Sequence, residues 1–153
     1  MDRTSTNQNT YYTYIERVDF MNPSIKQTAD TIIQALKVEG IIIQYYESIS
    51  SESVYLKLDY GVLKSLRISD HNGKKHLKYR YNIQTNIQRS RYDREQKRFY
   101  YPMSDVNKLI EQILKDRNDK TTRYGQAKYN EFMMQNHKDN RSKNGFWKDS
   151  VVI

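Results

Sequence analysis

Ser69, Asp70 and His71, with His76 close behind, form the one local cluster whose side chains could do chemistry. A histidine next to an aspartate could transfer protons or hold the metal ion of a nuclease. The same residues lie where a hairpin turn is expected, and Asp commonly hydrogen-bonds its own backbone in such a turn. The remaining histidine, His137, lies in a polar region. We therefore expect no enzyme and keep a metal-dependent nuclease using Asp70 and His71 as the less favoured alternative.

The composition excludes several other kinds of site. The chain has no cysteine, which rules out disulfides, thiolate metal sites and a cysteine nucleophile. It has no His-x-His or His-x-x-x-His pair, no Walker-type phosphate loop and no Gly-x-Ser-x-Gly motif. We expect neither a cofactor nor a metal.

Positive charge is concentrated in the middle of the chain. Residues 60–101 hold eleven Lys/Arg against three Asp/Glu, a net charge of +8 that equals the net charge of all 153 residues. Residues 1–59 hold five Lys/Arg against eight Asp/Glu. Such asymmetry points to an anionic partner more strongly than a high overall pI does.

Tyrosines lie between these basic residues, a pattern typical of surfaces that bind nucleic acid without sequence preference. Arginines near position 90 suit bidentate contacts with phosphate. The expected partner is nucleic acid or a protein complex that handles nucleic acid. A basic, solvated sheet face without a specific partner is the simpler alternative. The candidate binding residues are Tyr55, Lys57, Arg67, His76, Lys78, Arg80, Arg89, Arg91, Arg94, Lys97 and Arg98.

Sequence patterns also predict the elements that position these residues. Asn22-Pro23 is typical of a helix start, and Gly40 of a helix end, which predicts a helix over about 23–39. Four strands follow, at 41–46, 54–59, 65–69 and 76–83. The first is rich in β-branched and aromatic residues, and apolar and polar residues alternate in the other three. Turns at 59–61 and 71–74 would link the last three strands as hairpins.

Two further helices are expected after a polar loop at 86–97 and a short extended piece at 98–102. The first begins at Ser104, residues 117–120 break or bend it, and the second covers about 121–137. The predicted fold class is α+β: a helix, an antiparallel four-strand meander, and two C-terminal helices packed on one sheet face. The other sheet face is left to solvent. The inward set would be Val54, Leu56, Leu58, Leu66, Ile68, Leu77, Tyr79 and Tyr81.

The chain is expected to form a single α+β domain over 11–140, with a disordered lead at 1–10 and a polar tail at 141–153. The polar start and the absence of a run of about 20 apolar residues predict a cytoplasmic protein with no membrane contact. Lys, Asn, Ile and Tyr are plentiful while Gly and Pro are few, which fits AT-rich codons and a bacterial host cell of low GC content.

One stretch of sequence resembles a known kind of protein. Ser51-Glu52-Ser53-Val54-Tyr55-Leu56, Leu66-Arg67-Ile68-Ser69-Asp70-His71 and Lys78-Tyr79-Arg80-Tyr81-Asn82 are similar to a pattern in small uncharacterised phage and mobile-element proteins. The resemblance implies a phage-borne accessory protein. Proteins of this size and setting include anti-CRISPR inhibitors. We expect this chain to be a non-enzymatic inhibitor of that kind, which binds a CRISPR effector nuclease or its guide complex through the basic sheet face and the Arg-rich loop. A phage nucleic-acid-binding protein serving replication, packaging or transcription is the alternative.

Overall fold

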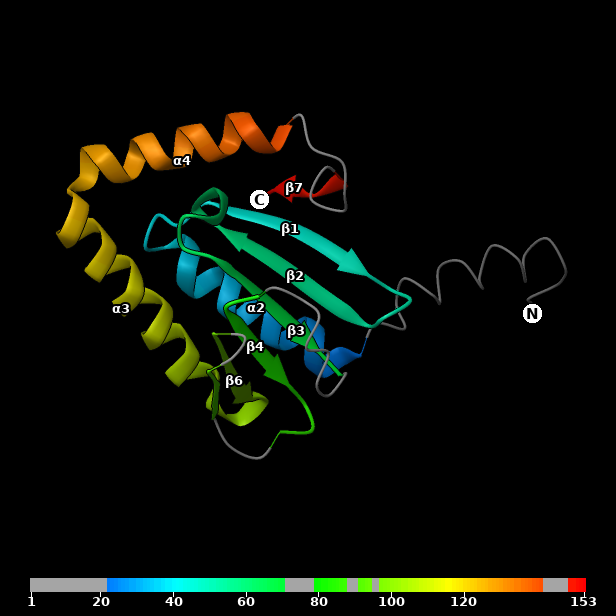
Figure 1. The fold of residues 1–153 in the computed structure, drawn as a ribbon. Coiled ribbons are helices and arrows are strands. Elements are labelled where there is room, and N and C mark those ends of the chain that lie inside the picture. The colour runs from blue at the N-terminus through cyan, green and yellow to red at the C-terminus, as the bar shows by residue number, and fades with distance from the viewer. Residues whose placement is uncertain (1–21, 71–78, 88–90, 95–96, 142–148) are drawn as a thin grey trace, which may run out of the picture.

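The computed structural model describes residues 22–70, 79–87, 91–94, 97–141 and 149–153, and these form a seven-stranded sheet with helices around it (Figure 1). The sheet order is β5-β6-β4-β3-β2-β1-β7. In chain order the elements are α2 (Pro23–Lys37), β1 (Ile43–Ser48), β2 (Ser53–Leu58), the 3-10 turn η1 (Asp59–Gly61), β3 (Ser65–Ser69), β4 (Tyr81–Gln84), β5 (Arg91–Asp93), β6 (Arg98–Pro102), the 3-10 turn η2 (Met103–Asp105), α3 (Val106–Tyr124), α4 (Gln126–Arg141) and β7 (Val151–Val152).

Helix α2 forms as its sequence predicts. The Asn22 side chain accepts a hydrogen bond from the Ser24 amide at 2.9 Å, and Pro23 occupies the first turn, where no amide hydrogen is needed. The helix ends before Gly40, whose φ of +78° suits a residue without a Cβ. Its buried face consists of Ile25, Ala29, Ile32, Ile33 and Leu36.

The first three strands form the predicted antiparallel meander. β1 pairs with β2, which pairs with β3 through the η1 turn. In that turn Asp59, Tyr60 and Gly61 have φ values of +49°, +54° and +92°. Such consecutive left-handed residues reverse the chain tightly and bring Leu58 and Lys64 together, with the Leu58 amide donating to the Lys64 carbonyl at 2.9 Å.

The prediction of a fourth antiparallel strand is wrong. β4 runs parallel to β3, with Leu66 opposite Tyr81 and Ile68 opposite Ile83, so the chain between them is a crossover and not a hairpin. The hairpin expected at 71–74 lies outside the described residues, and the parallel pairing excludes it as the connection. The alternation of apolar and polar residues marks a strand but carries no information on its direction, which explains the error.

The sheet is wider than expected on both edges. The extended piece predicted at 98–102 is β6, which pairs parallel with β4, and β5 adds an antiparallel edge strand beside it. At the opposite edge, Val151 and Val152 pair with β1 as β7. The predicted tail at 141–153 therefore ends in a sheet strand. The predicted lead at 1–10 lies outside the described residues.

One face of the sheet forms the main core. Ile43, Leu56, Ile68 and Ile83 project from successive strands and are buried against α2 and α3. Figure 1 shows α2 behind the sheet, with α3 along its side. The predicted inward set is confirmed for β2, β3 and Tyr81; Leu77 lies outside the described residues and Tyr79 faces the other way.

The predicted break at 117–120 is wrong, and α3 continues to Tyr124 before Gly125, with a φ of +84°, turns the chain into α4. Tertiary contacts hold this polar stretch helical. The Arg117 guanidinium donates to Asp59 at 2.9 Å and to the Glu39 carbonyl at 2.8 Å, and Lys120 donates to the Val62 carbonyl at 2.6 Å.

Helix α4 contacts α3 and the η1 turn, so it does not pack on the sheet face as expected. Tyr129 is fully buried, and its hydroxyl donates to Asp59 at 2.5 Å. The ring of His137 lies 4.3 Å from that of Tyr60, measured between ring centroids.

Candidate partner-binding surface

The second face of the sheet is not the solvated basic surface that the sequence predicts. Tyr55 is 7% exposed, Arg67 0% and Arg98 1%, so these three candidates lie inside the protein. Lys57 is half-buried. His76, Lys78 and Arg89 lie outside the described residues. A partner therefore cannot bind to a continuous row of cations on this face.

Aromatic and uncharged polar side chains occupy this second face. The rings of Tyr46 and Tyr55 are 6.1 Å apart, and those of Tyr55 and Tyr79 are 5.1 Å apart. Ser53, Ser69 and other uncharged polar residues are buried beside them. Parallel strands in the middle of a wide sheet are normally covered on both faces, which explains the burial around β3 and β4.

A bend before β4 sends Arg80 to the opposite side from the one predicted. Tyr79 packs on the second face, whereas Tyr81 packs in the main core. Arg80 lies between them, and its guanidinium carbon is 4.9 Å from the ring centroid of Phe99, which packs against the core. A shift of one residue in a strand reverses the faces of its side chains, so the error follows from an unrecognised bend.

Arg80 instead lines a pocket of about 180 Å³ between α3 and the start of β3. Four cationic side chains and two carboxylates contribute to its wall. Lys64 and Arg123 are exposed, and Arg80 and Lys120 are half-buried. The described lining residues are Leu63, Lys64, Arg80, Tyr81, Asp116, Asp119, Lys120 and Arg123.

The two pocket carboxylates are engaged by side chains other than the four cations. Asp116 accepts hydrogen bonds from the Tyr81 hydroxyl and, at 2.9 Å, from the Gln112 amide. Asp119 pairs with Lys115 at 3.0 Å. Within the described part of the chain, the four cations of the pocket make no ion pair. Their charge is therefore available to a ligand or partner.

Lys120 lies in surroundings that disfavour its positive charge. Burial lowers the pKa of its ammonium group below the usual 10.5, and the neighbouring charges of Lys64 and Arg80 lower it further. A lowered pKa means that the site disfavours its own positive charge. An anion in the pocket would relieve this repulsion.

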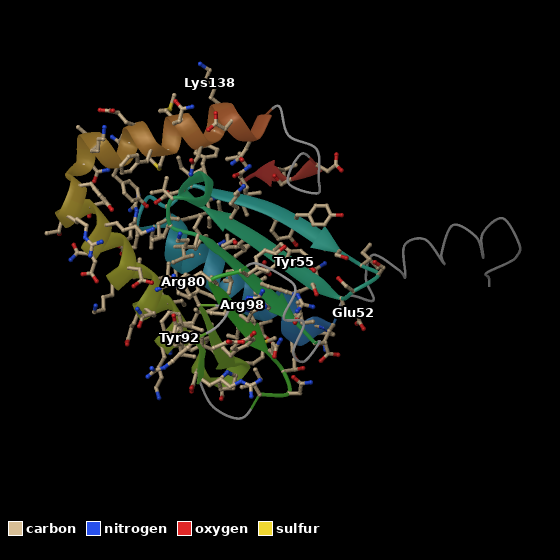
Figure 2. All side chains as sticks on the ribbon, in the orientation of Figure 1. Glu52, Tyr55, Arg80, Tyr92, Arg98 and Lys138 are labelled. Carbon is tan, nitrogen blue, oxygen red and sulfur yellow. The ribbon has the colours of Figure 1, made fainter. Side chains whose placement is uncertain are left out.

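Aromatic contacts connect the pocket to the β5–β6 edge. Phe99 packs between Arg80 and Tyr92, whose ring centroid is 4.6 Å from that of Phe99. Tyr92 is 42% exposed. Figure 2 shows Arg80 and Tyr92 on the same side of the molecule, near α3.

The edge hairpin carries three more exposed cations. Arg91 lies over the ring of Tyr100 at 5.2 Å, and Arg94 and Lys97 follow in and after the turn. We call the pocket cations and these three residues together the basic strip. Its members are Lys64, Arg80, Lys120, Arg123, Arg91, Arg94 and Lys97.

Sequence reasoning missed three of these residues, Lys64, Lys120 and Arg123. Lys120 and Arg123 are three residues apart on one helix, a spacing that places them on one face. That signal was present, but it could be used only if the helix was known to continue through residues 117–120. Lys64 lies outside the strand alternation, at a φ of +77°.

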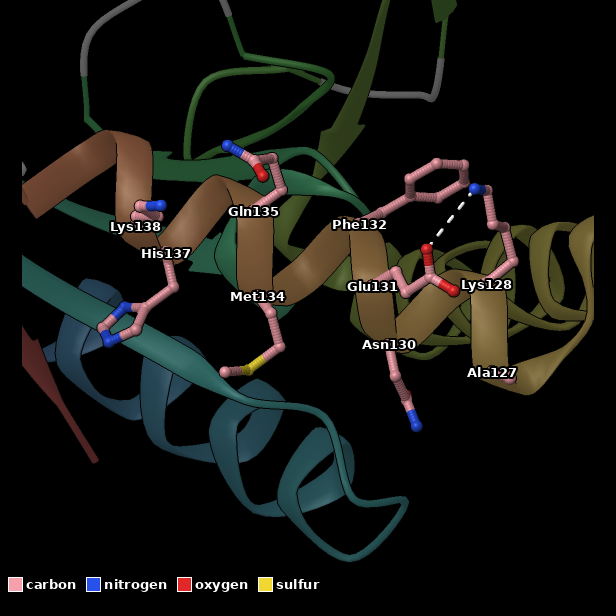
Figure 3. A pocket seen from close by; sticks show the side chains of 9 residues that line it. All are labelled: Ala127, Lys128, Asn130, Glu131, Phe132, Met134, Gln135, His137 and Lys138. Atoms are coloured by element: carbon pink, nitrogen blue, oxygen red, sulfur yellow. Dashed lines mark hydrogen bonds and ion pairs between the residues drawn. The ribbon is translucent and has the colours of Figure 1, made fainter.

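A second cavity, of about 680 Å³, runs along α4 (Figure 3). Its described lining comes from this helix alone, with Met134 and His137 directed to one side in Figure 3. Lys128 and Glu131 pair with each other at 3.4 Å. In the candidate chemical cluster, Asp70 accepts a hydrogen bond from Thr85, and His71 and His76 lie outside the described residues. The described residues contain no group of three His, Cys, Asp or Glu that could hold a metal ion.

In the part of the chain that the structure describes, no helix is both long and apolar enough to cross a bilayer. Comparisons with protein-family models, with curated proteins and with solved structures find no match to this chain.

Proposed function

We propose that this protein is a non-enzymatic binding protein that engages nucleic acid through the basic strip. The observation that carries the proposal is the set of pocket cations that make no ion pair with any described residue, linked by the Arg80–Phe99–Tyr92 contacts to the β5–β6 edge where Arg94 and Lys97 lie. Clustered unpaired cations bind phosphates because association releases the counterions condensed on the nucleic acid.

The aromatic component favours nucleic acid over a merely acidic partner. Tyr92 is 42% exposed and packs against Phe99, which also contacts Arg80 of the pocket, and bases stack on such rings whatever their sequence. An acidic protein surface would need only the cations of the basic strip. Single-stranded nucleic acid, whose bases are unstacked, would contact both these cations and the ring of Tyr92.

The direct test is fluorescence anisotropy with labelled single-stranded DNA, duplex DNA and duplex RNA. Lys64→Glu with Arg123→Glu reverses two exposed pocket charges and should weaken binding by at least about tenfold. Lys37→Glu with Lys138→Glu makes the same change in net charge away from the strip, on exposed positions of α2 and α4, and should change the affinity much less. Equal losses in both variants would mean that net charge, not the strip, drives binding.

The resemblance of residues 51–82 to phage and mobile-element proteins supplies the biological setting for the proposal. A guide-loaded CRISPR effector presents exposed nucleic acid next to protein, and we propose that such a complex is the target. The wild-type protein should then inhibit target cleavage by a susceptible effector, and the Lys64→Glu/Arg123→Glu variant should not. Tight nucleic-acid binding without inhibition of any effector tested would favour the alternative, a phage accessory protein for replication, packaging or transcription.

A further inference from the structure

A charged side chain lies buried on the second face of the sheet, away from the basic strip. Arg67 is 0% exposed and makes no ion pair with any residue that the structure describes. Its one hydrogen bond there runs from a terminal nitrogen to the Ser53 hydroxyl at 3.3 Å. The Nε and Nη1 atoms are buried without an acceptor among the described residues.

A second buried donor lies next to it. Asn82 is opposite Arg67 in the β3–β4 register, so both side chains project from the same sheet face. Asn82 is 2% exposed, and its side-chain amide nitrogen is buried without an acceptor among the described residues. Three unpaired donor atoms on neighbouring strands are therefore collected in one place.

The positive charge of Arg67 needs compensation that the described residues around it do not supply. A guanidinium cannot lose its proton in a protein, so burial cannot neutralise it. The centroid of the Tyr55 ring lies 5.9 Å from the guanidinium carbon. The free energy of such a cation–π contact is much smaller than the free-energy cost of burying a charge. Burial raises the pKa of nearby Tyr79 well above the usual 10.0, so this phenol is neutral near pH 7 and offers no charge.

We propose that Arg67 and Asn82 bind a small oxyanion, of the size of phosphate or a carboxylate, on the second face of the sheet. A planar guanidinium presents adjacent donors in the geometry that two oxygen atoms of such an anion accept, and the Asn82 amide supplies a further donor. The site is separate from the pocket cations of the basic strip, because Arg67 lies on the opposite sheet face from the Arg80–Phe99 contact. Arg91 of the strip shares the face of Arg67, but it lies on β5, two strands beyond Asn82.

The test is the thermal stability of the protein against inorganic phosphate, with acetate and chloride as separate arms at constant ionic strength. Above its dissociation constant, each tenfold increase in a bound anion should raise the midpoint by about 3–5 °C for a chain of this size. A response to phosphate but not acetate identifies phosphate, and the reverse identifies a carboxylate. A midpoint that depends on none of the anions beyond ionic strength overturns the proposal.

Variants assign the response to the site. Arg67→Met keeps the length of the side chain without its charge and should abolish the dependence on the anion. Asn82→Ala should lower the affinity for the anion at least about tenfold, because it removes one hydrogen-bond donor. Arg91→Met, on an exposed arginine of the same sheet face, and the strip variant Lys64→Glu/Arg123→Glu should both retain the full response.

An unchanged response in Arg67→Met and Asn82→Ala would contradict the site even if phosphate stabilises the protein. Should Arg67→Met not fold, the NMR signal of the Arg67 Nε–H group in wild type gives the answer directly. It should shift downfield and exchange more slowly with added anion, and a signal that does not change would overturn the assignment. Because loss of the strip leaves this response intact, failure here is distinguishable from failure of the nucleic-acid proposal.

Discussion

The guanidinium of Arg80 lies over the ring of Phe99, with its central carbon 4.9 Å from the ring centroid. This contact holds a cation of the α3 pocket against β6, and the neighbouring strand β5 carries the exposed ring of Tyr92. It therefore links the charges of α3 and of the β2–β3 connection, through Phe99 and Tyr92, to the β5–β6 edge where Arg94 and Lys97 lie. The proposed function depends on this continuity.

The Tyr92 ring should act as a stacking platform for an unpaired base. Tyr92→Leu should reduce the affinity for single-stranded DNA by about 1–3 kcal/mol, because base–aromatic stacking is lost. Duplex affinity should change little, since paired bases are not free to stack on the ring. Anisotropy with both ligands measures the difference. Tyr92→Phe retains the ring and should behave as wild type; an equal loss in that variant would show that stacking is not the role of this residue.

The Asp59 carboxylate should be the main polar anchor between the sheet and the C-terminal helices. It is 0% exposed and accepts hydrogen bonds from the Ile42 amide at 2.9 Å, from Arg117 and from Tyr129. Asp59→Ala should cost about 3–5 kcal/mol in the free energy of unfolding, because Arg117 loses its buried partner. Tyr129→Phe should cost about 1.5–3 kcal/mol for one hydrogen bond to a charged group.

Urea unfolding followed by circular dichroism measures both losses. Lys115→Ala breaks the exposed Lys115–Asp119 pair, whose side chains are 68% and 53% exposed, and should cost less than about 1 kcal/mol. If Asp59→Ala were no more costly than this surface control, Asp59 would not be the anchor.

Stability should fall above pH 10. Burial raises the pKa of Tyr79, Tyr81 and Tyr129 above the usual 10.0, and hydrogen bonds to Asp116 and Asp59 raise it further for the latter two. Below pH 10.0 these phenols are protonated in both the folded and the unfolded state, so titration does not yet lower the free energy of unfolding. Above it the unfolded chain releases phenolic protons that the folded protein retains, so the free energy of unfolding decreases.

The unfolding free energy measured at about pH 9, about pH 10 and about pH 11 tests this dependence. Tyr81→Phe removes one of the contributing groups and should make the decline shallower, whatever its effect at neutral pH. A free energy that stays constant across this range would mean that the three phenols titrate as they do in the unfolded chain.

Local patterns in the sequence predicted the local structure well. Asn22, Pro23 and Gly40 fixed the limits of α2, and alternation around Leu56 and Ile68 identified β2 and β3 with their correct inward faces. The ends of α2 depend on contacts between residues close in the chain. The inward faces of β2 and β3 depend only on which residues of each strand share a sheet face. The direction of β4 relative to β3 is different, because apolar and polar residues alternate in the same way in parallel and antiparallel strands.

The location of the candidate surface depends on tertiary contacts, which the sequence does not reveal. Arg67 and Arg80 look alike as outward basic positions, yet one is fully buried and the other lines the α3 pocket. The difference arises from a bend before Tyr81 and from the burial of the second sheet face around β3 and β4. Lys120 joined the surface because its helix continues through a polar stretch that Asp59 and two backbone carbonyls hold in place.

The salt dependence of nucleic-acid binding tests the central claim most directly. For duplex DNA, the logarithm of the association constant should fall linearly with the logarithm of the salt concentration, with a slope of about −0.9 for each phosphate neutralised. Replacing both Lys64 and Arg123 by alanine should make this slope shallower by about 2, whereas Lys37→Ala with Lys138→Ala should leave it unchanged. A wild-type slope near zero, or a slope that the strip variant does not alter, would contradict binding through the basic strip.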